Sequence, residues 1–160
     1  MSIEKVRAFL AQKGRENEIM EFEVSSATVE LAAQAVGVEG ARIAKTLSFS
    51  DNNGGCLLIV AAGDARIDNK KFKATFEFKA RMLSHEDALA HTGHAVGGVC
   101  PFALPEGVKV YCDESLRRFE HIYPACGSSN SAIKLTPDEL AELSGASWID
   151  VCKLPEGKII

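Results

Sequence analysis

The sequence predicts a single α/β domain, with strands at its centre and about five helices outside them. Segments whose apolar residues recur at helical spacing alternate along the chain with apolar, β-branched runs that are typical of strands. The 160 residues suffice for one hydrophobic core. No proline- or serine-rich linker and no low-complexity tract divides the chain. We therefore expect residues 1–160 to form one domain.

The first part of the chain predicts two helices separated by a strand. Apolar residues at helical spacing indicate a helix over residues 2–14, and the alternating segment 19–24 indicates a strand. Thr28 is a suitable N-cap for a second helix over residues 29–36, and Gly37 is a suitable end for it.

Two apolar runs follow and predict a β-hairpin. Residues 41–50 and 55–63 are rich in apolar, β-branched and aromatic side chains, and a turn-forming Asp-Asn-Asn-Gly-Gly sequence joins them. The second run is apolar almost throughout, which is typical of a strand buried on both faces.

The rest of the chain alternates in the same way. Helices are indicated over 68–76, 84–93 and 136–145, and the last two have the residue spacing of a capping box at their starts. We expect strand 131–135 to pair with strand 120–126 across the turn at 127–130. The other predicted elements are strands at 79–83, 107–113 and 147–153 and a helical turn at 114–119.

Lys45 is unusual for its position in a predicted strand. It shares the apolar side of that strand with Ile43, Leu47 and Phe49, where a cation is costly unless it is paired or lines a cleft. Lys45 is thus a candidate to bind a phosphate or carboxylate. The alternative is a lysine that extends its amine past the strand end into solvent.

The segment His-Ala-Val-Gly-Gly-Val-Cys-Pro-Phe-Ala-Leu-Pro, residues 94–105, combines flexible and stiff residues in an apolar context. Gly97 and Gly98 lack the side chains that would keep a ligand away from the main chain. Pro101 stiffens the loop and disfavours helical geometry at Cys100. The loop could direct backbone N–H and C=O groups at a substrate. Alternatively, it is a tight turn between a helix and a strand.

Charge and composition narrow the possible partners. The net charge of −4 argues against a protein that coats nucleic acid nonspecifically. A local basic cluster at Lys70, Lys71 and Lys73 is either a contact for a phosphate backbone or a solvated helix face. The sequence contains no long apolar run and no signal-peptide pattern. We therefore expect a cytoplasmic location and no membrane partner.

Common catalytic motifs are absent from the sequence. It contains no GxSxG elbow, P-loop, Rossmann glycine fingerprint or HExxH motif, so an enzyme here is expected to work without a dedicated nucleophile. His91 and His94 could meet one metal from a helix face, but no third ligand is obvious, and we expect no metal. The five cysteines form no closely spaced pair and are expected to be core thiols carried on strands.

Several motifs together resemble one family. A lysine-threonine pair at 45–46, a G-x-x-x-P loop at 97–101 and a Gly/Ser-rich turn before Ile-Lys-Leu-Thr-Pro-Asp-Glu-Leu occur in order along the chain. This combination resembles the YbaK/ProX family of trans-editing aminoacyl-tRNA deacylases, which is related to the editing insertion of bacterial prolyl-tRNA synthetases. The resemblance covers nearly the whole chain.

The resemblance implies a fold, an activity and partners. The implied fold is a single domain with a curved, mixed β-sheet approaching a barrel and flanked by helices. The implied reaction is hydrolysis of the ester that joins a wrong, small amino acid to the terminal adenosine of tRNA. Misacylated tRNA is the expected partner, and an aminoacyl-tRNA synthetase is a further candidate partner. We expect no cofactor and no DNA, and a monomer or weak dimer.

The resemblance also implies site residues. Lys45 and the main chain of Gly97 and Gly98 form the expected catalytic group, with Lys45 engaging the terminal phosphate. Where several members carry a serine and an aspartate, this chain has Ala125 and Ala132, so those contacts are not carried over; Ser128, Ser129 or Asn130 could replace them. The expected substrate-binding residues are Thr28, Thr46, Val99, Cys100, Pro101, Gly127, Ser128 and Asn130.

An aminoacyl ester is already reactive, which bears on the mechanism. Backbone groups that polarise the carbonyl, together with a neighbouring ribose hydroxyl that activates water, could suffice without a side-chain base. Two alternatives stay open. One is a module that binds a nucleotide, an aminoacyl-adenylate or the tRNA end without hydrolysis, and the other is a zinc hydrolase built on His91, His94 and a cysteine.

Overall fold

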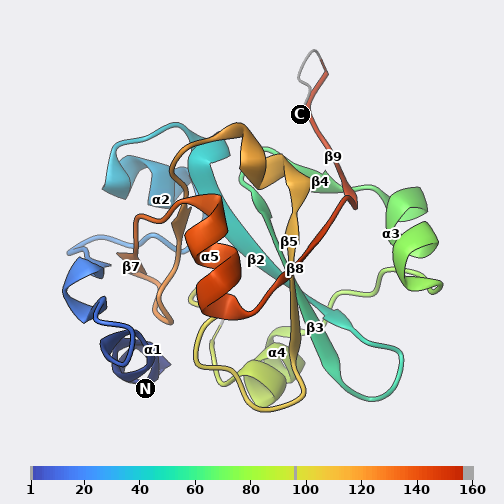
Figure 1. The fold of residues 1–160 in the computed structure, drawn as a ribbon, viewed down its shortest axis with the longest axis horizontal. Coiled ribbons are helices and arrows are strands. Elements are labelled where there is room, and N and C mark those ends of the chain that lie inside the picture. The colour runs from blue at the N-terminus through green and yellow to red at the C-terminus, as the bar shows by residue number, and fades with distance from the viewer. Residues whose placement is uncertain (1, 96, 157–160) are drawn as a thin grey trace.

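A mixed five-stranded sheet forms the centre of the protein, and helices surround it (Figure 1). The computed structural model describes residues 2–95 and 97–156. The strand order is β6-β2-β3-β5-β8, in which only β2 and β3 are antiparallel. These strands are β2 (Ile43–Ser50), β3 (Cys56–Ala62), β5 (Lys109–Asp113), β6 (Tyr123–Pro124) and β8 (Ser147–Ile149).

Two small antiparallel sheets complete the strand pairing. One joins β1 (Met20–Glu21) to β7 (Ser131–Ala132), and the other joins β4 (Arg66–Ile67) to β9 (Cys152–Lys153). Five α-helices occur in the described residues, so the expected single α/β domain with about five helices is confirmed. They are α1 (Ser2–Ala11), α2 (Val29–Val36), α3 (Asn69–Phe76), α4 (His85–Thr92) and α5 (Pro137–Ser144). Short 3-10 helices are η1 (Glu16–Glu18), η2 (Gly40–Arg42) and η3 (Glu114–Arg118).

The central hairpin forms as the sequence predicts. β2 and β3 pair in continuous register from Ala44 opposite Ala62 to Ser50 opposite Cys56. Every residue of β3 is buried, because β2 and β5 flank it and both of its faces lie in the core. The apolar run therefore identified the innermost strand correctly.

The predicted helix starts are also confirmed. The Thr28 side chain accepts a hydrogen bond from the Leu31 N–H, and Gly37 ends α2 in the left-handed conformation. Thr136 and Glu139 form a complete capping box at the start of α5. At the start of α4, one of the two hydrogen bonds of the expected capping box is present: the Ser84 hydroxyl oxygen accepts from the Asp87 N–H.

The predicted strand at 147–153 is divided in two. β8 pairs with β5, but the chain then turns away, because the Asp113 carboxylate accepts a hydrogen bond from the Val151 N–H at 2.8 Å. β9 continues beyond this point and pairs with β4, a two-residue strand that the sequence pattern did not reveal.

Two further strand predictions were only partly correct. The predicted strand 79–83 makes only a single bridge, between Met82 and Phe49. The predicted strand 131–135 pairs with two partners. Its first two residues pair with β1, and Leu135 forms the expected bridge with Ile122. Within the described chain no pairing joins the edge strands β6 and β8, so the approach to a barrel stays an expectation.

All five cysteines are buried free thiols. Cys56, Cys112 and Cys152 lie on strands, whereas Cys100 and Cys126 lie in loops. Burial raises the pKa of Cys56 to about 11 and the pKa of Cys100 to about 12, so these thiols stay protonated at neutral pH. No helix of the described residues has the length and apolarity needed to cross a membrane.

Candidate active site

A cavity of about 360 Å³ lies along β2. Four parts of the chain that are distant in sequence form its wall: the start of α2, residues 43–48 of β2, the loop at 97–99, and the strand region at 123–132. The segment that leads into α4 adds Met82, Leu83 and His85. The cavity thus gathers several of the residues that the sequence singled out.

Lys45 lines this cavity and is partly buried. Its Nζ donates to the Gly63 carbonyl at 3.3 Å and to the Ala65 carbonyl, both in the turn after β3. Burial lowers the pKa of Lys45, and the nearby Cys152 and the Asp64 carboxylate offset that effect only in part. An ammonium has three donors, so one remains for an anion in the cavity.

The turn that holds Lys45 is itself fixed by a shielded ion pair. The Arg118 guanidinium, on η3, donates to both carboxylate oxygens of Asp64, at 3.1 and 2.5 Å. The two side chains are 12% and 13% exposed, so solvent screens this pair less than it screens a surface pair. Gly63 packs so closely on the Gly40 carbonyl that a Cβ at this position would collide with it. The amine of Lys45 is therefore held by an anchored backbone.

The glycine loop reaches the cavity at one of its two glycines. Gly97 lines the wall, with a φ of +85°, and a Cβ there would lie 2.9 Å from the Cβ of Ala27. Gly98 is turned the other way, and a Cβ there would lie 2.8 Å from the backbone of Gly127 and Ser128. The paired glycines therefore give the main chain access to the cavity and also let two loops pack together.

The rest of this loop divides between the cavity and the core. Val99 lines the cavity. Cys100 and Pro101 are buried outside its wall, and the Cys100 thiol lies near the Phe102 carbonyl and the His94 ring. The structure therefore brings Val99 to the site and places the two other predicted substrate contacts behind it.

The two threonines predicted to bind substrate both line the cavity. The Thr28 hydroxyl oxygen already accepts the capping hydrogen bond of α2, from the Leu31 N–H at 3.1 Å. Thr46 lies in β2 directly after Lys45 and is half buried.

The turn at 127–130 supports the site without lining it. The Ser128 hydroxyl donates within the turn, and the Asn130 amide donates to the Phe22 carbonyl at 2.9 Å. Gly127, Ser128 and Asn130 are all absent from the cavity wall, whereas Ala125 and Ala132 are part of it. The two alanines thus line the site, whereas none of the expected polar substitutes, Ser128, Ser129 and Asn130, is part of the cavity wall.

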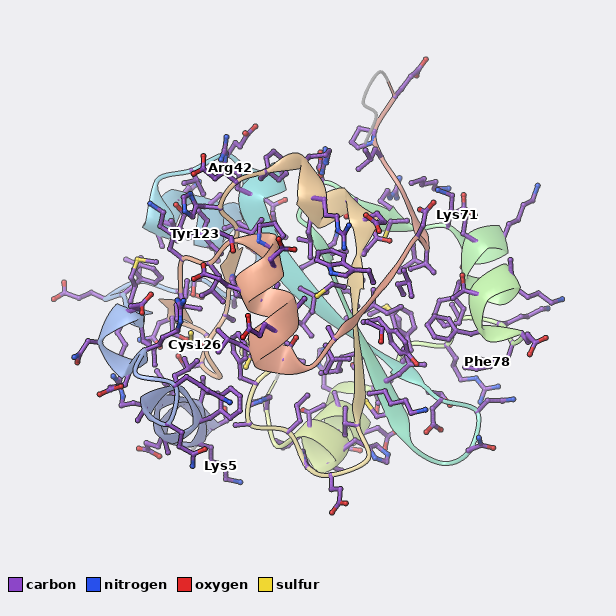
Figure 2. The ribbon with its side chains drawn as sticks, viewed as in Figure 1. Lys5, Arg42, Lys71, Phe78, Tyr123 and Cys126 are labelled. Carbon is purple, nitrogen blue, oxygen red and sulfur yellow. The ribbon has the colours of Figure 1, made fainter. Side chains whose placement is uncertain are left out.

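None of the three lysines of α3 lines the cavity. Figure 1 places α2 and α3 at opposite ends of the long axis, and Figure 2 shows the same separation between Tyr123, which lines the cavity, and Lys71. Lys71 donates to the Asp150 carboxylate and to the Cys152 carbonyl, both at 3.0 Å. Lys70 and Lys73 are exposed. A contact of α3 with tRNA would therefore be separate from the cavity.

His91 and His94 do not meet at a common site. The His94 ring is fully buried, and its Nε2 lies 2.8 Å from the Phe102 carbonyl. Burial lowers the pKa of His94, so the ring stays neutral in the core. The described residues contain no group of three His, Cys, Asp or Glu side chains that could hold a metal ion.

The cavity also contains residues that the sequence analysis missed. Ser26, Met82, His85, Tyr123 and Ser131 line its wall. Met82 is an exposed large apolar side chain, and the Ser26 hydroxyl oxygen is buried without a hydrogen-bond partner among the described residues. These residues carry no local motif, and only the long-range packing of their segments on β2 brings them together.

Comparisons with known proteins identify the family of this chain. Residues 23–143 match the family described as the aminoacyl-tRNA editing domain. The chain is 58% identical over 154 residues to the "Uncharacterized protein YwhH" of Bacillus subtilis (strain 168), covering 96% of this chain and 98% of that protein. It is 29% identical to the "Putative Cys-tRNA(Pro)/Cys-tRNA(Cys) deacylase EbsC" of Enterococcus faecalis (strain ATCC 700802 / V583), covering 78% and 76%.

A solved structure extends the similarity to the whole fold. The structure described as "Crystal structure of a putative trans-editing enzyme for prolyl tRNA synthetase" superimposes with a TM-score of 0.85 at 31% identity, covering 95% of this chain and 97% of that chain. A proline–tRNA ligase of Pelobacter propionicus matches 78% of this chain over 23% of its own length, at 26% identity. These similarities support aminoacyl-tRNA editing as the general function and link the fold to prolyl-tRNA synthetases. The chain belongs to the aminoacyl-tRNA editing domain family.

Proposed function

We propose that this protein is a cytoplasmic trans-editing deacylase, which hydrolyses the ester between a small amino acid and the terminal adenosine of a misacylated tRNA. One observation carries the proposal: the ammonium-bearing Lys45 and the bare main chain of Gly97 line the same cavity. The ammonium of Lys45 is suited to binding a phosphate, and the bare main chain of Gly97 allows an ester to approach closely.

The cavity wall supports a small amino acid as the substrate. Val99, Ala125 and Ala132 present short apolar side chains where a larger residue would close the space. Each added methylene on a substrate side chain changes its binding by about 1–3 kcal/mol in such a pocket. These short side chains leave room for an apolar substrate side chain, and we propose that its size distinguishes a small amino acid from a larger cognate residue.

The proposed mechanism assigns separate tasks to the protein and the substrate. Lys45 binds the phosphate of the terminal nucleotide and fixes its position. Main-chain groups of the loop at 97–99 polarise the ester carbonyl, and such donors contribute about 3 kcal/mol each where they have been removed in enzymes. The free ribose hydroxyl beside the ester activates the attacking water, which adds to the carbonyl carbon and expels the ribose oxygen. We propose that the reaction needs no metal.

A deacylation panel tests this function. Transcripts of tRNA, beginning with proline tRNA, are charged with alanine, serine, threonine or cysteine, and ester loss is followed with and without a chelator. We expect at least one small amino acid to be released by the protein in both conditions. Lys45→Ala should remove the activity, and Lys134→Ala, a change of an exposed lysine outside the cavity, is the matched control. Full activity of the Lys45 variant would refute the site.

A non-catalytic binding module is the second candidate function. It is favoured by Ala125 and Ala132, which place no polar group on the part of the wall that they form. Binding of a non-hydrolysable aminoacyl-adenosine with no ester hydrolysis across the whole panel would favour this module over the deacylase.

A further inference from the structure

One part of the cavity wall is an open stretch of sheet edge. β2 pairs with β3 along nearly its whole length. Its other edge is paired at residues 43–44, by β6, and again at residues 48–50, by segment 81–83. In that second contact, the Leu83 N–H donates to the Ser48 carbonyl at 3.1 Å and the Ser50 N–H donates to the Arg81 carbonyl at 2.9 Å. Among the described residues, no strand lies opposite Thr46 between the two contacts.

The backbone of Thr46 points toward this gap. In an antiparallel pair, successive residues direct their N–H and C=O groups alternately toward the partner strand and away from it. Ser48 and Ser50 bond to segment 81–83, so they point away from β3. Thr46 lies two residues before Ser48 and has the same orientation. Its N–H and C=O therefore face the open edge.

Three backbone groups are left without a partner in the described part of the chain. They are the Thr46 N–H, the Thr46 C=O and the Ser48 N–H, in the order donor, acceptor, donor. Thr46 and Ser48 both line the cavity, and Ser48 is only 7% exposed. Backbone groups in such surroundings are almost always paired, and an open strand edge pairs readily with another extended chain.

The length of the gap limits what could pair with it. Only one outward-facing residue separates the two paired stretches, so a peptide strand cannot enter. A single amino acid can, because its ammonium donor and its ester carbonyl flank one α-carbon, as the N–H and C=O of a strand residue do. Strand addition of this kind uses main-chain hydrogen bonds for affinity and leaves side chains to neighbouring pockets.

We propose that this open edge, residues 46–48 of β2, recognises the main chain of the substrate's amino acid. The α-ammonium donates to the Thr46 C=O, and the ester carbonyl accepts from the Ser48 N–H. The inference rests on the proposed function, because it takes the aminoacyl ester as the occupant. It assigns recognition of any α-amino acid to the strand edge and selection among side chains to the apolar wall.

The ammonium half of the proposal is tested by binding. The probes are 3′-deoxy-3′-(alanylamino)adenosine, which cannot lose its acyl group as an ester does, and its 3′-(propionylamino) analogue, which lacks only the amine. We expect removal of the amine to weaken binding about tenfold or more, which equals about 1.4 kcal/mol or more. Equal affinity of the two probes would overturn the proposal.

The backbone half is tested at Ser48. Incorporation of the α-hydroxy analogue of serine at this position replaces the N–H by an ester oxygen and keeps the side chain. We expect this variant to bind the alanylamino probe about tenfold more weakly than the wild type. Lys134→Ala, a change of an exposed lysine outside the cavity, is the control, and it should preserve the tenfold difference between the two probes. Unchanged binding by the Ser48 variant would contradict the assignment.

Failure of the function and failure of this inference give different results. If the wild type hydrolyses no charged tRNA but still binds the alanylamino probe in preference to the propionylamino probe, the strand-edge site stands and the deacylase function fails. If it hydrolyses charged tRNA but does not distinguish the probes, the function stands and the strand-edge site fails.

Discussion

At the scale of single residues, Lys45 links the site to pH. Burial lowers the pKa of Lys45, so its ammonium loses its proton at a lower pH than an exposed lysine does. The same lowered pKa means that protonated Lys45 opposes folding at pH values below it, and this cost disappears as the pH rises through it. The anchored carbonyls of Gly63 and Ala65 retain part of the stabilisation of the charged form.

We expect the phosphate affinity of the cavity to fall on the alkaline side before ordinary lysines titrate. The protonated amine binds phosphate and the neutral amine does not, so binding is strong below the lowered pKa and is lost as the pH rises through it. The measurement is the ratio of dissociation constants for the alanylamino-adenosine probe with and without a 5′-phosphate, followed against pH. A ratio that stays constant up to the usual lysine range would show that Lys45 does not bind the phosphate.

His85 offers a test of how water is activated. It is the imidazole side chain on the cavity wall within the described residues, at the first position of α4. If the ribose hydroxyl activates the water, His85→Ala should retain most of kcat. If His85 is a general base, the same change should lower kcat by about 10²–10⁴-fold. The kcat and KM of the variant on alanyl-tRNA distinguish the two mechanisms. We expect kcat to be largely retained, as it should be if the ribose hydroxyl activates the water.

At the scale of elements, the glycine loop combines access with packing. Gly97 opens the main chain to the cavity, whereas Gly98 lets the loop contact the turn at Gly127 and Ser128. That turn is tied in its own place by the hydrogen bond from Asn130 to the Phe22 carbonyl. The residues predicted to contact substrate in the turn therefore position the loop that reaches the cavity.

We expect Gly98→Ala to destabilise the fold as well as the site. A Cβ at Gly98 would lie 2.8 Å from backbone atoms, which cannot move aside as a flexible side chain can. A forced shift of this kind costs about 1–3 kcal/mol. Gly40→Ala is the control, since neither glycine has a positive φ and a Cβ at Gly40 would meet only the Val29 side chain, at an ordinary contact distance of 3.4 Å. Chemical denaturation of both variants gives the comparison, and equal losses would contradict the role of packing.

The sequence predicted most elements because their signals are local. Thr28 with Gly37, and Thr136 with Glu139, mark helix ends by hydrogen bonds within a few residues, and the run that became β3 needs no partner to be recognised as buried. Pairing over long distances was not predictable in this way. The end of β8 depends on the Asp113 carboxylate, 38 residues before Val151, and no pattern within 147–153 encodes it.

The same distinction explains the site. Lys45 and the loop at 97–101 were identified because a cation in an apolar strand and a paired glycine motif are unusual in themselves. Ser26, Met82 and His85 were missed, since each is ordinary in its own segment and reaches the cavity only through the fold. Ser128 and Asn130 were expected at the cavity from the family resemblance, as replacements for the missing polar contacts, but their hydrogen bonds hold the turn.

At the scale of the whole molecule, the basic helix α3 contributes no residue to the cavity and lies at the opposite end of the long axis from α2, which forms part of the cavity wall (Figure 1). A tRNA whose end enters the cavity would have to extend along the protein to reach α3. The net charge of −4 makes such a local cluster more important, because the rest of the surface does not attract a phosphate backbone overall. Lys70 and Lys73 are the exposed members of the cluster, while Lys71 is occupied by Asp150.

We expect Lys70→Glu combined with Lys73→Glu to weaken tRNA binding and leave the chemistry intact. Each phosphate contact that is lost should lower the slope of log affinity against log salt by about 1. The dissociation constant for tRNA at several salt concentrations measures this slope, and Lys134→Glu controls for a change of net charge elsewhere. Hydrolysis of a minimal aminoacyl-adenosine ester should be unchanged, because that substrate fills only the cavity. An unchanged salt slope would show that tRNA approaches the cavity without touching α3, and the acceptor end alone would then account for recognition.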